Sequence, residues 1–342
     1  MAQGSTLNLI KEYWQGLLLA VLIGIVGYGV KVVTKSPMAD PLLIAMMLGI
    51  IVRTAIGDRG KLKPGFTLAP TIFIPLGIVF YAANNLNFLK FAEVETDMIV
   101  LLIIIMLVYF AVILLLGKLL RQRKQITYLT ATGSAICGAS AIAITSPAVE
   151  AEPDDISISL LSVALAAFVG LFIIFPFLAT LFDITGESYG LLSGSVLQFT
   201  GFVKVAVENI PYLRTGLSEK ELVSLALSVK AVRYLGLLIA IPLFASLIKK
   251  RLYIPWVLWA FLISGLIGTG IYAADEIFYN NVLLFFIEPI YSLSWSIALA
   301  AIGLNANVKE LLSNEGTKAL IMAFAGFFAA TITFFIGLYI IG

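Results

Sequence analysis

The chain has 342 residues, of which 61% are hydrophobic and only 12% are charged, and its mean hydropathy is +1.04. A soluble domain carries about 25% charged residues, so this composition excludes a water-soluble protein of this size and indicates that lipid covers most of the exterior. The formal net charge of +2 indicates no nucleic-acid partner, and a single cysteine, Cys137, excludes an intramolecular disulfide.

Eleven apolar stretches follow one another, each near the roughly 20 residues that a helix needs to cross a bilayer. They cover residues 14–33, 40–56, 66–83, 98–120, 126–150, 156–181, 189–209, 222–247, 254–274, 282–304 and 317–341. We therefore predict an all-α polytopic membrane protein with about eleven transmembrane helices. Only Lys11 precedes the first stretch and no small-residue cleavage site follows it, so we interpret it as a retained helix and not a signal peptide.

The seventh stretch, residues 189–209, leaves two interpretations open. It contains Gly194, Gln198, Gly201 and Lys204, which weaken a membrane helix. The stretch therefore either spans the membrane or enters and leaves on the same side.

Basic residues predict the orientation. With the N-terminus on side A, the loops of side A hold 14 Lys and Arg residues, whereas side B holds five, namely Lys31, Lys35, Lys90, Arg214 and Lys220. Cytoplasmic loops carry the excess of basic residues, so the N-terminus is predicted to be cytoplasmic and the C-terminus outside. The same alternation places an acidic cluster on side B, formed by Glu150, Glu152, Asp154 and Asp155.

An odd number of helices favours an internal repeat. If residues 1–36 form an extra N-terminal helix, residues 37–184 and 185–342 are two groups of five helices that start on opposite sides of the membrane. Two such halves are inverted repeats, which are common in transporters.

The fifth stretch contains a run of small and hydroxyl residues at positions 132–147. Glycine weakens a helix and Pro147 removes a backbone donor, so this run predicts an interrupted helix. In one interpretation its half-helix N-terminus binds an anion through free amides; in the other, small residues only allow close helix packing. The candidate site residues here are Gly133, Ser134, Cys137, Gly138, Ala139 and Ser140. Taken alone, Cys137 is interpreted as a small packing residue.

The run from Ser134 to Ala143, S-A-I-C-G-A-S-A-I-A, resembles the S-I-C-G-x-S-A-I-A signature of the YeiH-type sulfate exporter family. Further similar motifs are L-G-I-V-F at 76–80, V-K-A-V-R at 229–233 and A-A-I-G-L at 300–304. The chain departs from the family in the seventh stretch, where Gln198 stands at a histidine position and Phe202 at a glutamine position.

The resemblance implies a plan similar to that of sodium–proton antiporters and bile acid symporters. In that plan the interrupted helices of two five-helix repeats cross at mid-membrane, and here they would be the stretches 126–150 and 282–304. The resemblance also implies a homodimer and export of sulfate or a related anion.

Lys230 and Arg233 are ionisable residues near the middle of the eighth stretch, on one helix face. A charge at a helix centre costs about 2.5–3.5 kcal/mol on insertion scales, so the pair needs a partner or a function. Three interpretations are open: an oxyanion site shared with the interrupted helix and Gln198, a neutralising bridge to Glu288, or extension of the side chains to an interface.

Glu288 precedes Pro289 in the tenth stretch, and a polar run follows that includes Ser294 and Ser296. We predict the second helix interruption in this run, with Gly303, Asn305 and Asn307 as the alternative place, and Ser294 and Ser296 are candidate residues of the substrate site. Because the chain has no histidine, Glu288 is also the candidate carrier of a coupling proton.

These observations predict a multi-pass transporter of a bacterial or archaeal inner membrane, which moves a small anion such as sulfate or a sulfonate by alternating access. No phosphate-binding loop motif occurs, so the energy would come from an H+ or Na+ gradient or from the substrate itself. No cofactor and no enzymatic activity are expected. The alternatives are a cation–proton antiporter that uses Glu288 and a receptor or scaffold that transports nothing.

Overall fold

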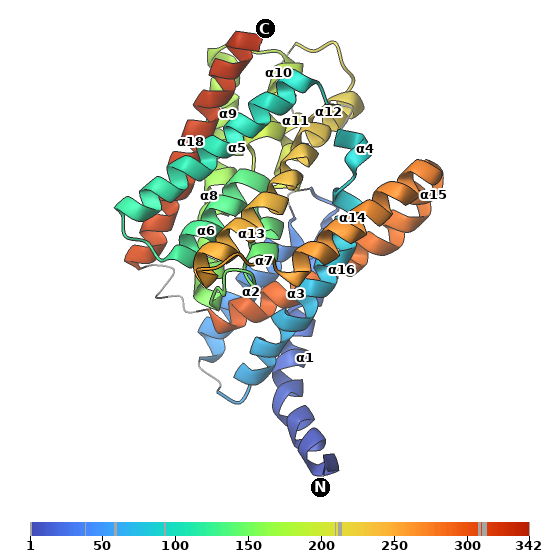
Figure 1. Ribbon diagram of the computed structural model, residues 1–342, viewed down its shortest axis with the longest axis vertical. Coiled ribbons are helices and arrows are strands. Elements are labelled where there is room, and N and C mark those ends of the chain that lie inside the picture. The colour runs from blue at the N-terminus through green and yellow to red at the C-terminus, as the bar shows by residue number, and fades with distance from the viewer. Residues whose placement is uncertain are drawn as a thin grey trace.

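The computed structural model describes residues 2–37, 39–57, 60–91, 94–208, 210, 214–306, 309 and 313–341, without the side chains of residues 2–12, 90 and 341. In this part of the chain all regular structure is helical (Figure 1). The main helices are α1 (Ala2–Thr34), α2 (Pro41–Ile56), α3 (Lys63–Asn85), α5 (Thr96–Leu119), α6 (Lys124–Thr132), α7 (Ala139–Thr145), α8 (Pro153–Val169), α9 (Phe175–Leu181), α10 (Gly186–Val196), α11 (Thr200–Glu208), α12 (Glu219–Val232), α13 (Gly236–Lys249), α14 (Trp256–Ala274), α16 (Leu284–Asn305) and α18 (Asn314–Ile341). Short helices are α4 (Phe88–Phe91) and α15 (Glu276–Phe278).

Among the described residues, eight helical segments are long and apolar enough to cross a membrane. Three of them consist of two helices joined by a 3-10 or a π-helical turn. In the segment Glu219–Lys249, for example, a 3-10 turn at Arg233–Leu235 joins α12 to α13. The helix α2 is apolar but shorter. The prediction of an all-α polytopic membrane protein is therefore confirmed.

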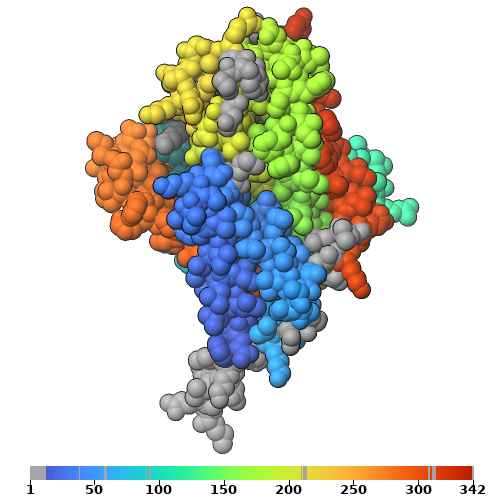
Figure 2. Space-filling view, turned by 180° about the vertical axis from the view of Figure 1, so that it is seen from behind, coloured from blue at the N-terminus to red at the C-terminus, as the bar shows by residue number. Residues whose placement is uncertain are grey.

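The helices pack into two groups. The first, which we call the panel, consists of α1, α2, α3, α14 and α16, and its helices contact one another extensively. The second, which we call the bundle, contains α5 to α13 and α18. Figure 2 shows the N-terminal helices of the panel in blue beside the green and yellow helices of the bundle. Contacts between the groups are sparse compared with those inside each group.

Helices α6 and α7 form a re-entrant hairpin, which we call hairpin 1 (residues 124–145). A π-helical turn at Gly133–Cys137 ends α6, and Gly138 reverses the chain with φ of +66°. The two ends of hairpin 1 lie at the same end of the bundle, because Arg123 pairs with Asp155 at 3.1 Å and Glu150 pairs with Lys249. The interruption predicted in this stretch is present.

Helices α10 and α11 form a second re-entrant hairpin, hairpin 2 (residues 186–208). Its first amide, at Gly186, donates to the carbonyl oxygen of Arg214 at 2.7 Å, so its beginning and the chain just after it lie together. Its reversal is at residues 197–199, between the two helices. Hairpin 2 enters from the end of the bundle opposite to hairpin 1, so the two reversals meet inside the molecule (Figure 1).

The prediction of eleven crossings was wrong, because two of the eleven stretches, 126–150 and 189–209, turn back inside the bundle. The acidic cluster also lies on the other side from the one predicted: Glu150 and Asp155 pair with Lys249 and Arg123, which belong to the basic side. The Lys and Arg counts could not reveal the hairpins, for two reasons. Residues 125–203 contain neither Lys nor Arg. In addition, two hairpins in succession leave all later loops on the same sides that eleven crossings would give them.

The prediction of an interruption in the tenth stretch was also wrong. Helix α16 is continuous from Leu284 to Asn305 and includes Pro289 and both serines. Ser296 donates to the carbonyl oxygen of Ser292 at 2.7 Å, so its hydroxyl is bonded within the helix. Gly303 allows close packing, since a Cβ there would lie 2.2 Å from the carbonyl oxygen of Met46. Asn307 lies outside the described residues.

Candidate functional site

The reversals of the two hairpins meet around Lys230. Its side chain is fully buried near the middle of the segment Glu219–Lys249. Its ammonium group donates to the carbonyl oxygens of Ile136 at 2.7 Å, Leu197 at 2.6 Å and Gln198 at 2.8 Å. One oxygen comes from hairpin 1 and two come from hairpin 2, so Lys230 joins the two reversals directly.

Arg233 lies one turn further along and is also fully buried. Its Nε donates to the carbonyl oxygen of Ala135 at 2.9 Å and its Nη2 donates to that of Ser134 at 2.8 Å. Its Nη1 contacts the carbonyl oxygens of Leu197 at 2.8 Å and Gly194 at 3.3 Å. Arg233 therefore also contacts both hairpins.

These carbonyl groups belong to the C-terminal ends of two half-helices, the turn after α6 and the end of α10. Such ends carry unsatisfied carbonyls and the negative pole of the helix dipole, which cations stabilise. Within the described part of the chain neither Lys230 nor Arg233 forms an ion pair with a carboxylate. The predicted bridge from this pair to Glu288 is wrong, and so is the predicted extension to an interface.

Glu288 lies in the panel, on α16. Its carboxylate accepts a hydrogen bond from Lys31 of α1 at 2.8 Å, with the side chains 49% and 34% exposed. Ser294 and Ser296 are buried in the same helix, which packs mainly against α2 and α3. The structure therefore places these three candidate residues in a different helix group from Lys230 and Arg233.

The candidate residues of hairpin 1 do lie together at its reversal. Gly133, Ser134 and Cys137 belong to the π-helical turn, Gly138 makes the reversal, and Ala139 and Ser140 begin α7. Gly138 is needed at this position because its φ of +66° and ψ of −124° are unfavourable for any residue with a Cβ, and a Cβ would also lie 3.0 Å from the ring of Phe199. All except Ser140 are buried.

Hairpin 2 contributes two residues, Gln198 and Phe202, at which the chain departs from the YeiH-type pattern that it resembles. Gln198 is fully buried; its amide nitrogen donates to the Tyr109 hydroxyl at 3.3 Å, while its carbonyl oxygen Oε1 has no hydrogen-bond partner. Phe202 is buried and packs on Phe199 with ring centroids 5.2 Å apart. The Ser134 hydroxyl of hairpin 1 is likewise buried and without a partner. Buried polar atoms of this kind need a water, an ion or a ligand.

A second set of polar groups lies where the hairpins face the panel. The Ser140 hydroxyl, next to the Cys137 sulfur at 3.1 Å, is 3.3 Å from the Tyr81 hydroxyl of α3. The Thr200 hydroxyl, at the start of α11, is 3.1 Å from the Tyr234 hydroxyl. Each hairpin therefore presents the first hydroxyl after its reversal to a tyrosine, and both hydroxyl-bearing residues are only half-buried.

Aromatic side chains of the panel complete this interface. The ring of Tyr81 lies 5.9 Å from Tyr234, 5.4 Å from Tyr291 and 4.7 Å from Trp295, and Asn84 donates to the Tyr291 hydroxyl at 3.0 Å. We call the set Tyr81, Asn84, Ser140, Thr200, Tyr234 and Tyr291 the hydroxyl cluster. Of these six residues, only Ser140 was a candidate from the sequence. Tyrosines are frequent at membrane interfaces, and nothing in the spacing of Tyr81, Tyr234 and Tyr291 marks them as part of a site.

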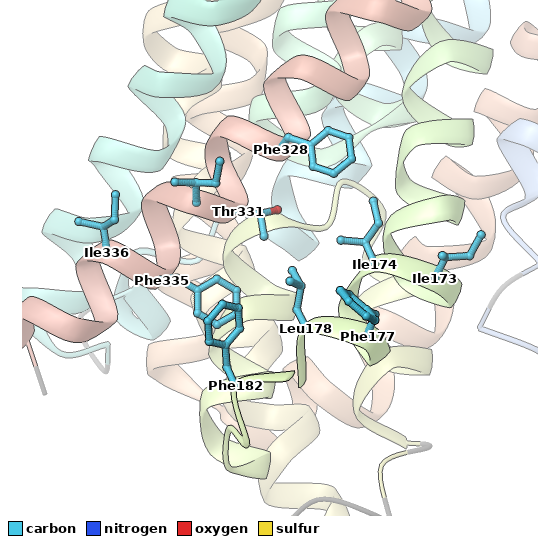
Figure 3. Close-up of a pocket in the computed structure, with 10 residues that line it drawn as sticks. Ile173, Ile174, Phe177, Leu178, Phe182, Phe328, Thr331, Phe335 and Ile336 are labelled. Atoms are coloured by element: carbon cyan, nitrogen blue, oxygen red, sulfur yellow. The ribbon is translucent and has the colours of Figure 1, made fainter. Parts of the chain in front are cut away.

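A groove of about 450 Å³ lies on the outside of the bundle, between α9 and α18 (Figure 3). Phenylalanine and isoleucine side chains line it, and the hydroxyl of its one polar residue, Thr331, donates to the carbonyl oxygen of Phe327 at 2.8 Å within α18. No polar atom there is free to recognise a solute. We therefore place the candidate site at the hairpin reversals and not in this groove.

Comparison with known proteins agrees with a membrane protein. The model of the family described as Conserved hypothetical protein 698 matches residues 15–323. A UPF0324 membrane protein of Archaeoglobus fulgidus is 26% identical over 318 residues, which cover 92% of this chain and 90% of the relative. UPF0324 membrane proteins of Staphylococcus epidermidis and Fusobacterium nucleatum are 25% and 24% identical, over 88% and 93% of this chain and 89% and 95% of theirs. No solved structure matches the chain.

Proposed function

The chain belongs to the family described as Conserved hypothetical protein 698, whose relatives are membrane proteins of bacteria and archaea, and from this premise we propose that it is a secondary transporter for a small anion. The observation that carries the proposal is the meeting of two re-entrant hairpins from opposite ends of the bundle around Lys230 and Arg233. Interrupted backbone at membrane depth is tolerated only where it is buried in protein or lines a watery cavity, and transporters use it to bind solutes at mid-membrane.

Charge supports an anion as the solute. The two buried cations have no carboxylate partner in the described residues, so a solute that binds beside them meets a positive charge. The chain's resemblance to the YeiH-type family narrows the proposed substrates to sulfate, a related oxyanion or a sulfonate. The donors of Lys230 are fully used by carbonyl groups, so the solute would bind beside the pair and feel its charge without direct contact.

The hydroxyl cluster is the proposed contact surface for the solute. It lies at the interface between panel and bundle, where Ser140 and Thr200 are half-buried. Alternating access would then be a movement of the bundle against the panel, which their sparse contacts allow. Hydroxyl groups donate hydrogen bonds to oxyanions without fixing a charge beside them.

The test is binding and flux of a panel of anions and cations with the purified protein. A ligand at 100 times its dissociation constant stabilises the folded state by about 2.7 kcal/mol, so sulfate, sulfite or a short sulfonate is expected to raise the unfolding temperature. In liposomes the same anion is expected to move. If no anion raises the unfolding temperature or moves across the liposome membrane, while sodium or protons do have an effect, the anion proposal is wrong and a cation antiporter is favoured.

Matched variants locate the site. Ser140→Ala combined with Thr200→Val is expected to weaken the apparent affinity of the anion by about tenfold, equivalent to about 1.4 kcal/mol. Thr333→Val is the control, because that hydroxyl is bonded to the carbonyl oxygen of Ala329 within α18 at 2.8 Å. An equal effect of both changes would contradict the proposed contact surface.

A further inference from the structure

The surroundings of the Lys230 ammonium group have the form of a cation site. Three carbonyl oxygens from two separate hairpins lie 2.6–2.8 Å from one nitrogen, in a fully buried position. Three acceptors require three N–H donors, which only the protonated ammonium provides. A fixed positive charge therefore occupies the point toward which the three carbonyl groups converge.

In many secondary transporters, carbonyls of unwound backbone and the C-terminal ends of half-helices coordinate a coupling ion such as sodium. Here the same kinds of groups are present, namely the end of the turn Gly133–Cys137 and the residues that follow α10. No group of three carboxylate, cysteine or histidine side chains that could hold a metal ion occurs in the described ranges. The carbonyl oxygen atoms that would bind a coupling cation thus already accept hydrogen bonds from the Lys230 side chain.

We propose that Lys230 is a built-in substitute for a coupling cation: its ammonium group fills a monovalent-cation site formed by the two hairpin reversals. This inference deepens the proposed transport function, on which its consequence for transport rests. The hairpins are then held together without any ion from solution. Transport is therefore independent of sodium and is driven by the gradient of the substrate or by exchange of one anion for another.

Lys230→Ala tests the site directly, because it deletes Cγ, Cδ, Cε and Nζ, which together have the shape and charge of propylammonium. The variant is expected to unfold at a lower temperature than the wild type. Propylammonium is expected to restore stability in a saturable way, and a small cation such as sodium to restore part of it. Propan-1-ol, which has the shape without the charge, is expected to have no effect.

Two controls separate a filled site from a general salt effect. Lys230→Met removes the charge but keeps most of the side-chain volume, so propylammonium should not restore it. Lys249→Ala removes a partly exposed lysine that pairs with Glu150, and its stability should not respond to propylammonium. If propylammonium and sodium leave Lys230→Ala unchanged, or restore all three variants equally, the inference is wrong.

A second test of the inference uses the wild-type protein alone. Its unfolding temperature and its anion flux are expected to be the same in sodium and in choline buffers of equal ionic strength. Stimulation of either by sodium would overturn the inference even if Lys230→Ala cannot be purified. The unfolding measurements use no substrate, so they test the cation site independently of transport. If propylammonium stabilises Lys230→Ala but the wild type moves no anion, the cation site is confirmed and only the proposed transport function is refuted.

Discussion

At the residue scale, the two buried cations hold the two hairpin reversals together through backbone carbonyl groups. Seven donor contacts from Lys230 and Arg233 reach carbonyl oxygens at the two reversals, and the oxygen of Leu197 accepts from both side chains. A buried charge is costly unless such contacts satisfy it, and a buried carbonyl is costly when it has no donor. The two costs are removed together here.

Arg233→Met is therefore expected to be severely destabilising. Removal of the guanidinium group leaves the carbonyl oxygens that it contacts buried without this donor, and each such group costs about 1–3 kcal/mol. Unfolding of the purified variant in detergent measures this loss. Arg251→Met is the matched control, since Arg251 is exposed after α13 and such changes stay within about 0.5 kcal/mol. Equal stability of the two variants would show that the contacts of Arg233 contribute little.

Gly138→Ala is expected to strain the reversal of hairpin 1. A Cβ at this backbone conformation costs about 1–3 kcal/mol, and it would also press on the ring of Phe199. Gly270→Ala is the comparison, because nothing lies within 4 Å of a Cβ there and alanine favours a helix such as α14 by up to about 1 kcal/mol. Opposite shifts in unfolding temperature are expected, and a gain in stability from Gly138→Ala would contradict the described reversal.

At the element scale, the positions of most helices followed from apolar length, whereas the paths of the hairpins did not. An apolar stretch of 20 residues has the same composition whether it crosses the membrane or turns back after a glycine. Charge usually distinguishes the two, but residues 125–203 carry no Lys or Arg. The pairing of Asp155 with Arg123, which fixes the end of hairpin 1, joins residues 32 positions apart and has no signature in the sequence.

The candidate site, like the fold, could be predicted from the sequence only in part. The small-residue run at 132–147 and the pair Lys230–Arg233 stood out because glycine, proline and charge are rare in apolar helices. Their meeting with residues 197–199 required the fold. Ser294 and Ser296 were assigned to the site on polarity alone, but serine is compatible with an uninterrupted helix when its hydroxyl bonds to the preceding turn.

The two hairpins predict a labelling pattern that eleven crossings would not produce. In a Cys137→Ala background, a cysteine at Glu152 should react with an impermeant thiol reagent from the same side as one at Lys249. A cysteine at Asp183 should react from the opposite side, together with one at Arg214, its ion-pair partner at 2.6 Å. Intact cells and inverted vesicles distinguish the sides. Labelling of positions 152 and 249 from opposite sides would refute hairpin 1.

At the scale of the whole molecule, the separation into panel and bundle is the feature that permits movement. The hydroxyl cluster lies across their interface, with Tyr81 and Tyr291 on one side and Ser140 and Thr200 on the other. A link across this interface should therefore stop transport, whereas a link inside the panel should not.

The test uses pairs of cysteines in the Cys137→Ala background and a short bifunctional thiol reagent. Linking positions 81 and 140 is expected to abolish anion flux. Linking positions 31 and 288, where Lys31 and Glu288 pair within the panel, is expected to leave at least half of it. A reagent that a reductant can cleave should restore the flux of the first pair. Flux that survives a complete link between 81 and 140 would mean that panel and bundle do not move apart there.

The order of the chain has a consequence for synthesis on the ribosome. Both hairpins precede Glu219–Lys249, the segment that carries Lys230 and Arg233. Until that helix is inserted, the carbonyls at the reversals have no donor, and each would cost several kcal/mol in hydrocarbon. The carbonyl groups at the reversals therefore need water as a partner until the chain has been made as far as Lys249, 41 residues beyond Glu208. The centre of this protein closes only when its own cations are inserted.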